Sequence, residues 1–582
     1  MNLDLQSLDD KRLAQLKWLP YAVCAFITAI IAIPVLNNLS NWGVRDWDLF
    51  TTLHAAAVRS LVDYHQFPFW NPYIGGGNIL FAHPEVPVLN PLFGLLLICG
   101  PLYGLKLQIL VVYFIGLLGG YKLARQVGTG IWGSYITSIA FMLCSFLSGH
   151  ITAGHIPFHY FAFFPWLVLF YKKSLGKPIH VISASACVAF IILGSGAAVP
   201  FLFSMFFLFL VSLCDMVSLK SLRPPLHVIA VGIGAVLLSA VKFFPMYDYL
   251  SRHPWVPEQT VQVTPLWIFP SMFFHLNQSI FADHIAGSYV WGWHEYGAYI
   301  GPFIFILALA ALIYRFRDNW PYLALIFISL VLVCGSFLPP LSPWDLLHQL
   351  PGFSSIRVPS RFALLAIFAF ALLAGKGFDL ISHRFGSRRH GIAPGIVAII
   401  LGTHLAVILP QLNETFKRPP ESVSYSSDFK QIDGNPNRMY AAFLANRGTI
   451  KAAWLSAYRE GRGIMTSDGA TQEWYSPNDR VNVISRRFSP NRISFDLQTA
   501  AGGQLMISQG FDPGWHRSDG KDVKSYSELV AFDVNAGEKQ VEIYYSPAYF
   551  TLGLVISILS ILAALGGALI WKQRLRDKPV LK

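Results

Sequence analysis

Two carboxylates and an arginine stand just after the first long apolar run of the chain. The segment NWGVRDWDLF, residues 41–50, places Arg45, Asp46 and Asp48 close behind the apolar residues 18–38. A carboxylate here could be a general base that takes a proton from a hydroxyl group, or it could cap a following helix. Residues two apart do not share a helical face, so at most one aspartate is expected to point into a pocket. Asp46, nearer the end of the first helix, is the preferred base.

Other residues that could take part in chemistry lie in segments rich in Pro, Gly and aromatic residues. Residues 66–91 contain WNPYIGGGN and AHPE, and residues 149–166 and 291–301 add further histidines and a glutamate. The candidate pocket residues are Trp70, Asn71, Tyr73, His83, Glu85, His155, His294 and Glu295. For the His and Glu residues, including His150 and His159, buried hydrogen bonding is the ordinary alternative to metal binding. Whether a divalent metal ion takes part stays open.

The composition predicts a membrane protein with many spans. The chain has 582 residues, of which 54% are hydrophobic and 13% charged, and its mean hydropathy is +0.47. These values are typical of polytopic membrane proteins. The net charge of +12 comes mostly from short Lys and Arg clusters between apolar runs, so it does not indicate nucleic-acid binding. About twelve apolar runs are long enough to span a bilayer, near residues 18–38, 103–123, 130–148, 157–172, 178–194, 199–216, 226–246, 297–315, 320–338, 360–380, 391–410 and 547–571.

The loops between these runs predict an orientation. Basic loops alternate with loops poor in Lys and Arg, and all basic loops share one side if both termini are cytoplasmic. We therefore expect a multi-pass membrane protein, with residues 1–410 forming the transmembrane domain. The outer loops are then 39–85, 247–295 and 339–359, and this places the candidate residues on one face of the membrane.

Two arginines near the end of the last of these outer loops are candidates for binding a phosphate. Arg357 and Arg361, in SSIRVPSRF, are four residues apart and would share a face of a helix. The positive-inside rule does not explain basic residues on the outer side. Two guanidinium groups suit the phosphate group of a substrate, and the alternative is anchoring to lipid headgroups.

The long polar stretch 411–546 changes the sequence pattern. Segments such as RISFDLQ and KQVEIYY alternate apolar and polar residues, and turn-forming SPN, AGG, DPG and NAG lie between such segments. We expect an extracytoplasmic β-sandwich. Residues 547–582 then form the last transmembrane helix and a basic cytoplasmic tail. Trp515, in FDPGWH, is expected to pack inside the sandwich.

The order of motifs resembles a known family. DWD, FPFWNPYIGGG, AHPE, RVPSRF, FDPGWH and YYSPAYFTLG follow one another as in bacterial membrane proteins of the YfhO family, which are similar to glycosyltransferases of the GT-C fold. The resemblance covers nearly the whole chain. It implies that an acidic residue of the first outer loop, here Asp46 or Asp48, is the base acting on an acceptor. It also implies that the donor is a sugar on a polyprenyl phosphate.

These observations favour an inverting, GT-C-like glycosyltransferase. Its partners would be a polyprenyl-phosphate-linked sugar, membrane lipid and an extracytoplasmic glycan or lipid acceptor, with no nucleic acid. The alternative is a non-enzymatic transporter or assembly factor for surface polysaccharide. A transporter is expected to carry ionisable residues at helix centres, whereas the polar residues here concentrate in outer loops.

Overall fold

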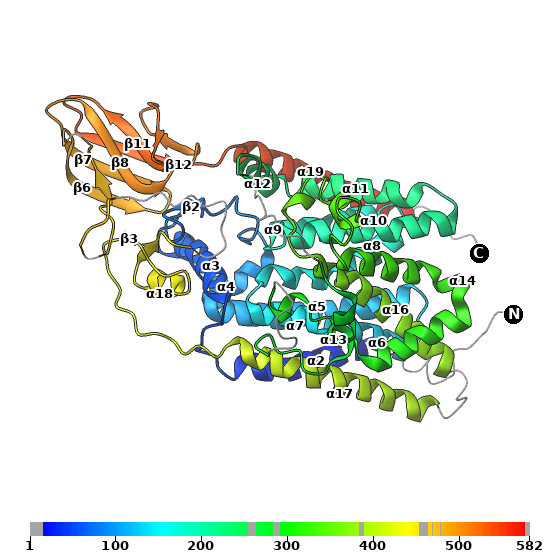
Figure 1. Cartoon of the computed structure of the whole chain (residues 1–582). Helices are drawn as coiled ribbons and strands as arrows, with labels where there is room; N and C mark the ends of the chain where they lie inside the picture. Colours follow the sequence, from blue (N-terminus) through cyan, green and yellow to red (C-terminus); the bar gives the residue numbers. More distant parts are fainter. Residues whose placement is uncertain are drawn as a thin grey trace.

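The computed structural model describes residues 16–253, 263–282, 291–382, 389–452, 464–467, 469–477 and 479–576. A helical bundle forms one end of the molecule and a β-sandwich the other (Figure 1). A layer of loops and short elements lies between them and includes α3 (Trp47–Val62), α4 (Gly94–Cys99) and α18 (Met439–Leu444). The start of α2 and the end of α19 both lie at the bundle end away from the sandwich.

The bundle contains the membrane spans. Within the described ranges, eight helices are long and apolar enough to cross a bilayer. They are α2 (Leu19–Leu36), α5 (Pro101–Gln126), α6 (Ile131–Met142) with α7 (Ser145–Ala153), α10 (Val199–Leu219), α14 (Gly301–Val333), η6 (Pro359–Phe362) with α16 (Ala363–Ser382), α17 (Arg389–Thr415) and α19 (Phe550–Arg576). A ninth arises if α11 (Arg223–Leu238) and α12 (Ala240–Arg252), bent by 92°, count as one span. The chain is a multi-pass membrane protein.

Two of the expected runs form helices that are not among these eight. The run at 157–172 begins as a 3-10 helix, η2 (Ile156–Phe163), and continues as the 13-residue α8 (Phe164–Gly176). The run at 178–194 gives α9 (His180–Leu193), with 14 residues. Each α-helix alone is shorter than the roughly 20 residues of a typical crossing, so neither is counted as a span by its length.

The helix α14 is folded back on itself near Arg315, whose backbone is not helical (φ −142°, ψ 49°). The two ends of α14 lie beside one short segment, because Ala298 N–H donates to the Met272 carbonyl and Thr264 N–H donates to the Cys334 carbonyl. A straight helix of 33 residues would be about 50 Å long, but residues 264–272 reach only ~30 Å when fully extended. The two arms correspond to the predicted runs 297–315 and 320–338.

The C-terminal domain is the predicted β-sandwich. One antiparallel sheet has the order β10-β11-β8-β5 and the other has the order β6-β7-β12-β9. The strands are β5 (Trp474–Tyr475), β6 (Asn482–Ser489), β7 (Arg492–Gln498), β8 (Gly503–Gly510), β9 (Trp515–Arg517), β10 (Lys524–Tyr526), β11 (Leu529–Val534) and β12 (Gln540–Tyr545). Alternate residues of both sheets, among them Phe495, Leu505, Phe532 and Ile543, form a shared core. Trp515 is buried in it, as expected.

The layer between bundle and sandwich is made of short elements. Two strands of the 66–91 segment, β1 (Trp70–Asn71) and β2 (Asn78–Ile79), pair with each other, and β3 (Lys430–Ile432) pairs in parallel with β4 (Arg447–Thr449). The remaining short helices are η1 (Pro91–Phe93), η3 (Leu266–Ile268), α13 (Phe269–Phe274), η4 (Trp293–Glu295), α15 (Pro343–Leu347) and η5 (Phe353–Ser355).

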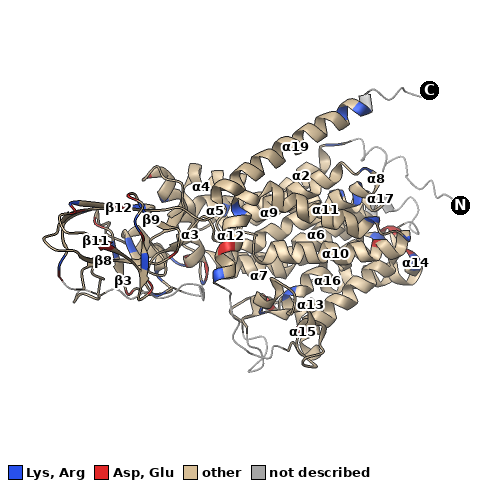
Figure 2. Ribbon diagram, turned by 90° about the horizontal axis from the view of Figure 1, so that it is seen from above, with Lys and Arg blue, Asp and Glu red and all other residues tan. Residues whose placement is uncertain are grey.

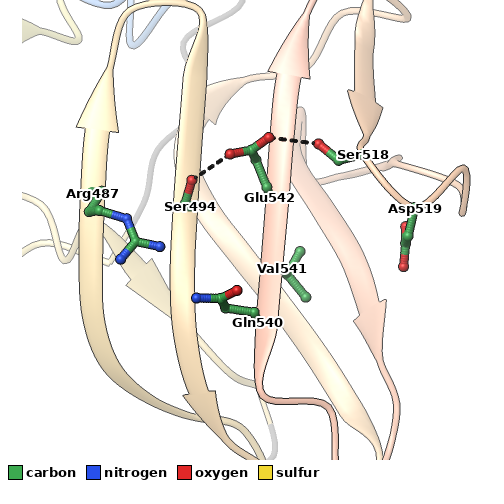
Figure 3. A pocket seen from close by; sticks show the side chains of 7 residues that line it. All are labelled: Arg487, Ser494, Ser518, Asp519, Gln540, Val541 and Glu542. Atoms are coloured by element: carbon green, nitrogen blue, oxygen red, sulfur yellow. Dashed lines mark hydrogen bonds between the residues drawn. The ribbon is translucent and has the colours of Figure 1, made fainter.

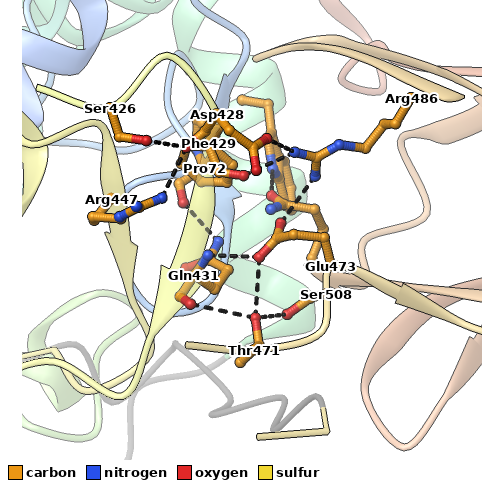
Figure 4. Close-up of polar contacts among 12 residues, drawn as sticks. Pro72, Ser426, Asp428, Phe429, Gln431, Arg447, Thr471, Glu473, Arg486 and Ser508 are labelled. Atoms are coloured by element: carbon orange, nitrogen blue, oxygen red, sulfur yellow. Dashed lines mark hydrogen bonds and ion pairs between the residues drawn. The ribbon is translucent and has the colours of Figure 1, made fainter. Parts of the chain in front are cut away.

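A polar network ties this layer to the sandwich (Figure 4). The buried Glu473 carboxylate accepts hydrogen bonds from the Gln431 backbone and the Thr471 hydroxyl, and it pairs with Arg486 of β6 at 3.1 Å. Thr471 in turn contacts Ser508 of β8 at 2.9 Å. Because a buried charge without its partners is costly, the network holds the two parts in one arrangement.

The bent helix α12 makes a second attachment. Arg252 at its end donates to Asp512 of the sandwich at 2.9 Å, and Tyr249 is buried in the sandwich core.

In the part of the chain that the structure describes, Lys, Arg, Asp and Glu lie mainly at the bundle end away from the sandwich, in the intermediate layer and on the sandwich (Figure 2). The middle of the bundle is drawn almost entirely as uncharged residues, as a membrane interior requires.

The predicted orientation can be tested with single cysteines. In a bacterial host, Ser525→Cys on the exposed strand β10 should react with a membrane-impermeant maleimide in spheroplasts. Lys177→Cys, in a basic loop, should react only after permeabilisation, since that loop is expected to face the cytoplasm. The six native cysteines are buried or partly buried, so the unmodified protein measures the background. The reverse labelling pattern would show that the orientation is inverted.

Candidate functional site

Two turns meet where the candidate base lies. Arg45 adopts a left-handed conformation (φ 54°) just before α3, and Gly154 does so (φ 93°) just after α7. The Asp46 N–H donates to the Ala153 carbonyl at 3.1 Å. A Cβ atom on residue 154 would come within 2.2 Å of the Trp47 nitrogen. Only glycine therefore permits the two turns to touch, and their contact fixes the position of Asp46.

The Asp46 side chain is directed away from its own helix. Asp46 occupies the N-cap position of α3, yet its carboxylate makes no capping hydrogen bond. Its Oδ2 atom instead lies 3.1 Å from Nε2 of His155, and the side chain is 26% exposed. Within the described residues, Oδ1 has no hydrogen-bond partner. Capping, the ordinary explanation for an aspartate at this place, does not account for it.

A histidine pair continues inward from Asp46. His155 Nδ1 lies 2.8 Å from Nδ1 of the buried His150, so one of these two atoms must carry the hydrogen. If His155 donates through Nε2 to Asp46, its Nδ1 accepts and His150 Nδ1 donates. His150 Nε2 is then unprotonated, and this buried atom has no hydrogen-bond partner among the described residues. It lies 3.7 Å from Glu295.

Glu295 and Arg361 form the charged centre of the site. Nε of Arg361 donates to Oε2 of Glu295 at 2.8 Å, and Nη2 donates to Oε1. Burial alone would raise the pKa of Glu295, but the Arg361 charge and these hydrogen bonds hold it well below its usual value. Burial lowers the pKa of the neighbouring His294 to about 3, so its ring is neutral near pH 7. Nη1 of Arg361 donates to no described residue.

Glu85 adds a second carboxylate. The residue is partly buried, and its side chain makes no hydrogen bond or ion pair within the described part of the chain. Burial, together with the nearby Asp46 charge, raises the pKa of Glu85 to about 7, against the opposing effect of His155, Arg361 and Lys242. The group can therefore change its charge near neutral pH.

The contacts of Asp48 differ from those of Asp46. It is buried, pairs with Arg418 at 2.9 Å and accepts hydrogen bonds from the Met439 and Tyr440 amides at the start of α18. These contacts use both carboxylate oxygens. Asp48 thus joins α3 to the intermediate layer.

Several predicted pocket residues lie elsewhere. Trp70 packs against Trp515 and Tyr545, and its ring nitrogen donates to Gln509. The structure buries Asn71 and Tyr73 as well, and the Tyr73 hydroxyl donates to Asn446 at 3.1 Å. Trp70 thus joins this segment to the sandwich, and Tyr73 joins it to the intermediate layer. None of the three residues contacts Asp46 in the described part of the chain.

Two further predicted residues have surroundings that the sequence did not indicate. His83 is buried, and burial lowers its pKa to about 3. Arg357 precedes the 3-10 turn that carries Arg361, so the expectation that both arginines share a helical face is wrong. The Arg357 guanidinium lies over the Trp291 ring, 5.6 Å from its centroid.

Lys242 was not predicted from the sequence. It is fully buried near the start of α12, and its Nζ donates to the carbonyls of Val86 and Gly194. It thereby holds the loop that carries Glu85, and its charge interacts with that of Glu85. A lysine inside the apolar run 226–246 was the available signal, because charges within such runs are rare.

Three side chains of the site have atoms that could bind a metal ion. Ligand atoms of His150, His155 and Glu295 all lie within 4.8 Å of one another. Two imidazoles and a carboxylate suit a transition metal. However, the His150–His155 contact uses both Nδ1 atoms, and Arg361 already neutralises Glu295. The arrangement leaves fewer ligands than the three protein groups of a catalytic zinc site, so we assign no metal to it.

Comparison with known proteins gives weak likenesses only. No family model and no curated sequence matches the chain. Among the similar solved structures are mycobacterial arabinofuranosyltransferase AftD (15% identity, TM-score 0.39, 68% of this chain) and ArnT from Cupriavidus metallidurans in the apo state (12%, 0.44, 75% of this chain and 86% of ArnT). An Archaeoglobus fulgidus oligosaccharyltransferase, in complex with Zn and sulfate, is similar at 13% identity (0.41, 77% of this chain and 63% of that one). The chain spans 28% of the length of AftD. Likenesses of this size do not decide the activity.

The different tasks of the two aspartates predict different effects on stability. Asp48→Ala leaves two buried amides without their acceptor and takes one of two carboxylate partners from Arg418, so its cost should be about 3 kcal/mol. Asp46→Ala removes a partly exposed group with one hydrogen bond, so its cost should be about 1 kcal/mol. Thermal unfolding of both purified variants in detergent measures the difference. Equal melting temperatures would contradict the structural assignment of Asp48.

Proposed function

We propose that this chain is a GT-C-like membrane glycosyltransferase, related to the YfhO family, that transfers a sugar from a polyprenyl phosphate to an extracytoplasmic acceptor. One observation carries the proposal. The Asp46 carboxylate does not cap its helix, is held by His155 and keeps Oδ1 available for a proton. The same His155 ring lies 4.0 Å from Glu295, the ion-pair partner of Arg361. A base and a cation close together are the two groups that sugar transfer from a phosphate requires.

The reaction is a single displacement. The acceptor hydroxyl oxygen attacks the anomeric carbon of the donor sugar, and its proton passes to Oδ1 of Asp46. The bond between the anomeric carbon and the phosphate oxygen breaks, and its electron pair leaves with the polyprenyl phosphate. One displacement inverts the configuration at the anomeric carbon.

The basic groups have distinct roles in this proposal. Nε and Nη2 of Arg361 donate to Glu295, so the remaining Nη1 is the atom that donates to the departing phosphate. Because the ion pair is bidentate, the guanidinium plane is fixed before the donor binds. Arg357, stacked on Trp291 in the same outer segment, adds a second positive charge for the phosphate. The Asp46–His155 hydrogen bond positions the base, and burial keeps His294 neutral beside it.

The base assignment predicts a loss of turnover. Asp46→Asn keeps the size of the side chain but removes its basicity, so kcat should fall about 10²-fold or more while donor binding changes little. Asp63→Asn, at the exposed end of the same helix, is the matched control and should behave as wild type. Mass spectrometry of lipids and glycans from a deletion strain and its complemented strain first names donor and product. Wild-type transfer by Asp46→Asn would exclude Asp46 as the base, and absence of transfer by the wild-type protein would favour a transporter or assembly factor.

The pKa of Glu85 predicts that kcat/KM depends on pH. With a pKa of about 7, its carboxyl group is mostly protonated at about pH 6 and mostly ionised at about pH 8. The ionised group adds negative charge near Asp46 and strengthens it as a base, so kcat/KM should rise across this interval. Glu85→Gln should remove the rise, whereas Asp63→Asn should keep it. The same pH profile in wild type and Glu85→Gln would exclude this role.

A further inference from the structure

One face of the sandwich is open and unusually polar. On the sheet β6-β7-β12-β9, alternate residues point away from the core, and the strand register places them in rows. Glu542 of β12 lies opposite Ser494 of β7, which lies opposite Arg487 of β6. The next row contains Gln540 and Asp496. The outward positions of these rows thus carry hydrogen-bonding groups instead of aliphatic side chains.

This face contains a shallow hollow of about 300 Å³ (Figure 3). It is lined by Arg487, Ser494, Ser518, Asp519, Gln540, Val541 and Glu542. The volume is at the lower end of the range of small-molecule sites. Figure 3 shows the Ser494 and Ser518 hydroxyls directed at the two sides of the Glu542 carboxylate.

The side chains of the face are held in fixed positions. Glu542 accepts hydrogen bonds from Ser494 at 3.0 Å and from Ser518 at 2.9 Å. Asp496 accepts one from the Gln540 amide at 2.8 Å. The Gln540 carbonyl oxygen has no donor within the described residues, and Arg487 is 63% exposed with further N–H groups. A ligand would meet oriented donors and acceptors, which lowers the entropy cost of binding.

The charges on this face cancel. Arg487 pairs with Asp496 at 3.2 Å and Arg492 pairs with Glu542 at 3.0 Å, so each positive group has a negative group on the next strand. A balanced surface gives no net attraction to anionic lipid or nucleic acid. Its donors and acceptors match a neutral ligand that is rich in hydroxyl groups, since a hydroxyl can donate and accept at once.

An aromatic pair lies beside the hollow. Tyr544 follows Glu542 on the same side of β12 and is opposite His516 of β9, with ring centroids 5.6 Å apart. Rings of this kind present an apolar surface with a polar edge, suited to the alternating C–H and hydroxyl groups of a sugar. The outer side of the second sheet differs, because Met506, Leu529 and Ala531 there are buried.

We propose that this face, defined by Arg487, Ser494, Gln540, Glu542, Tyr544 and His516, binds a neutral glycan chain. The hollow accommodates part of the chain, and the Tyr544–His516 pair supports the face of a neighbouring sugar ring. That this glycan is the acceptor of the transfer reaction rests on the proposed function. Glycan binding itself does not depend on that function, because the sandwich and the Asp46 site are separate parts of the fold.

The test uses the full-length protein in nanodiscs, without any donor. The probes are fluorescently labelled maltohexaose, cellohexaose, mannohexaose and galactohexaose, with hexagalacturonate as the charged comparison. We expect at least one neutral probe to bind more tightly than hexagalacturonate. Glu542→Gln and Tyr544→Ala should each weaken its binding about tenfold, equivalent to ~1.4 kcal/mol. Asp533→Asn, an exposed acidic residue on the other sheet, should leave the Kd unchanged.

Two controls separate the outcomes. Tyr544→Phe keeps the ring and should retain binding, so a loss seen only in Tyr544→Ala is due to the ring and not to misfolding. Asp46→Asn should bind the probe as wild type does. The inference is overturned if no neutral probe binds, or if Glu542→Gln and Tyr544→Ala leave the Kd unchanged. If the probe binds but the wild-type protein transfers no sugar, the proposed function fails and the glycan site stands.

Discussion

The close contact between two turns at Gly154 is the constraint on which the candidate site depends. Because this residue has no side chain, the turn at Arg45 can hydrogen-bond to the end of α7, and Asp46 comes within reach of His155. His155 in turn contacts His150, and both rings lie within 4.0 Å of Glu295, which pairs with Arg361. Residues from four separate segments thus meet although none of the segments is long. The base and the cation therefore belong to one cluster.

The second constraint is the attachment of the sandwich to the bundle. Asp48 and Arg418 join α3 to the α18 layer, Glu473 and Arg486 join that layer to the sandwich, and Arg252 joins α12 to Asp512. Such buried or partly buried pairs do not add much net stability, but removal of one partner is costly. They therefore specify one arrangement. The open polar face of the sandwich is consequently held at a fixed place at one end of the bundle.

The sequence predicted the fold class because its signals are local. Apolar runs located most spans, and period-two alternation predicted the sandwich. The sequence also selected Asp46, His155, His294, Glu295 and Arg361, which the structure brings together. The predictions that depended on tertiary contacts were less successful: Trp70 contacts the sandwich, Tyr73 contacts the intermediate layer, and the partner of Asp48 lies 370 residues away at Arg418. No spacing rule connects residues so far apart in the sequence. Lys242 was also missed, because the only indication of its role was a charged residue within an apolar run.

A structure with undecaprenyl phosphate tests the central claim most directly, since this lipid is of the class that the proposed reaction releases. Cryo-electron microscopy of the full-length protein in nanodiscs with this lipid would locate the phosphate. We expect a phosphate oxygen within about 3 Å of Nη1 of Arg361, with Asp46 Oδ1 facing the same space. A phosphate bound at another part of the molecule, away from Arg361 and Asp46, would contradict the assignment of this site to sugar transfer.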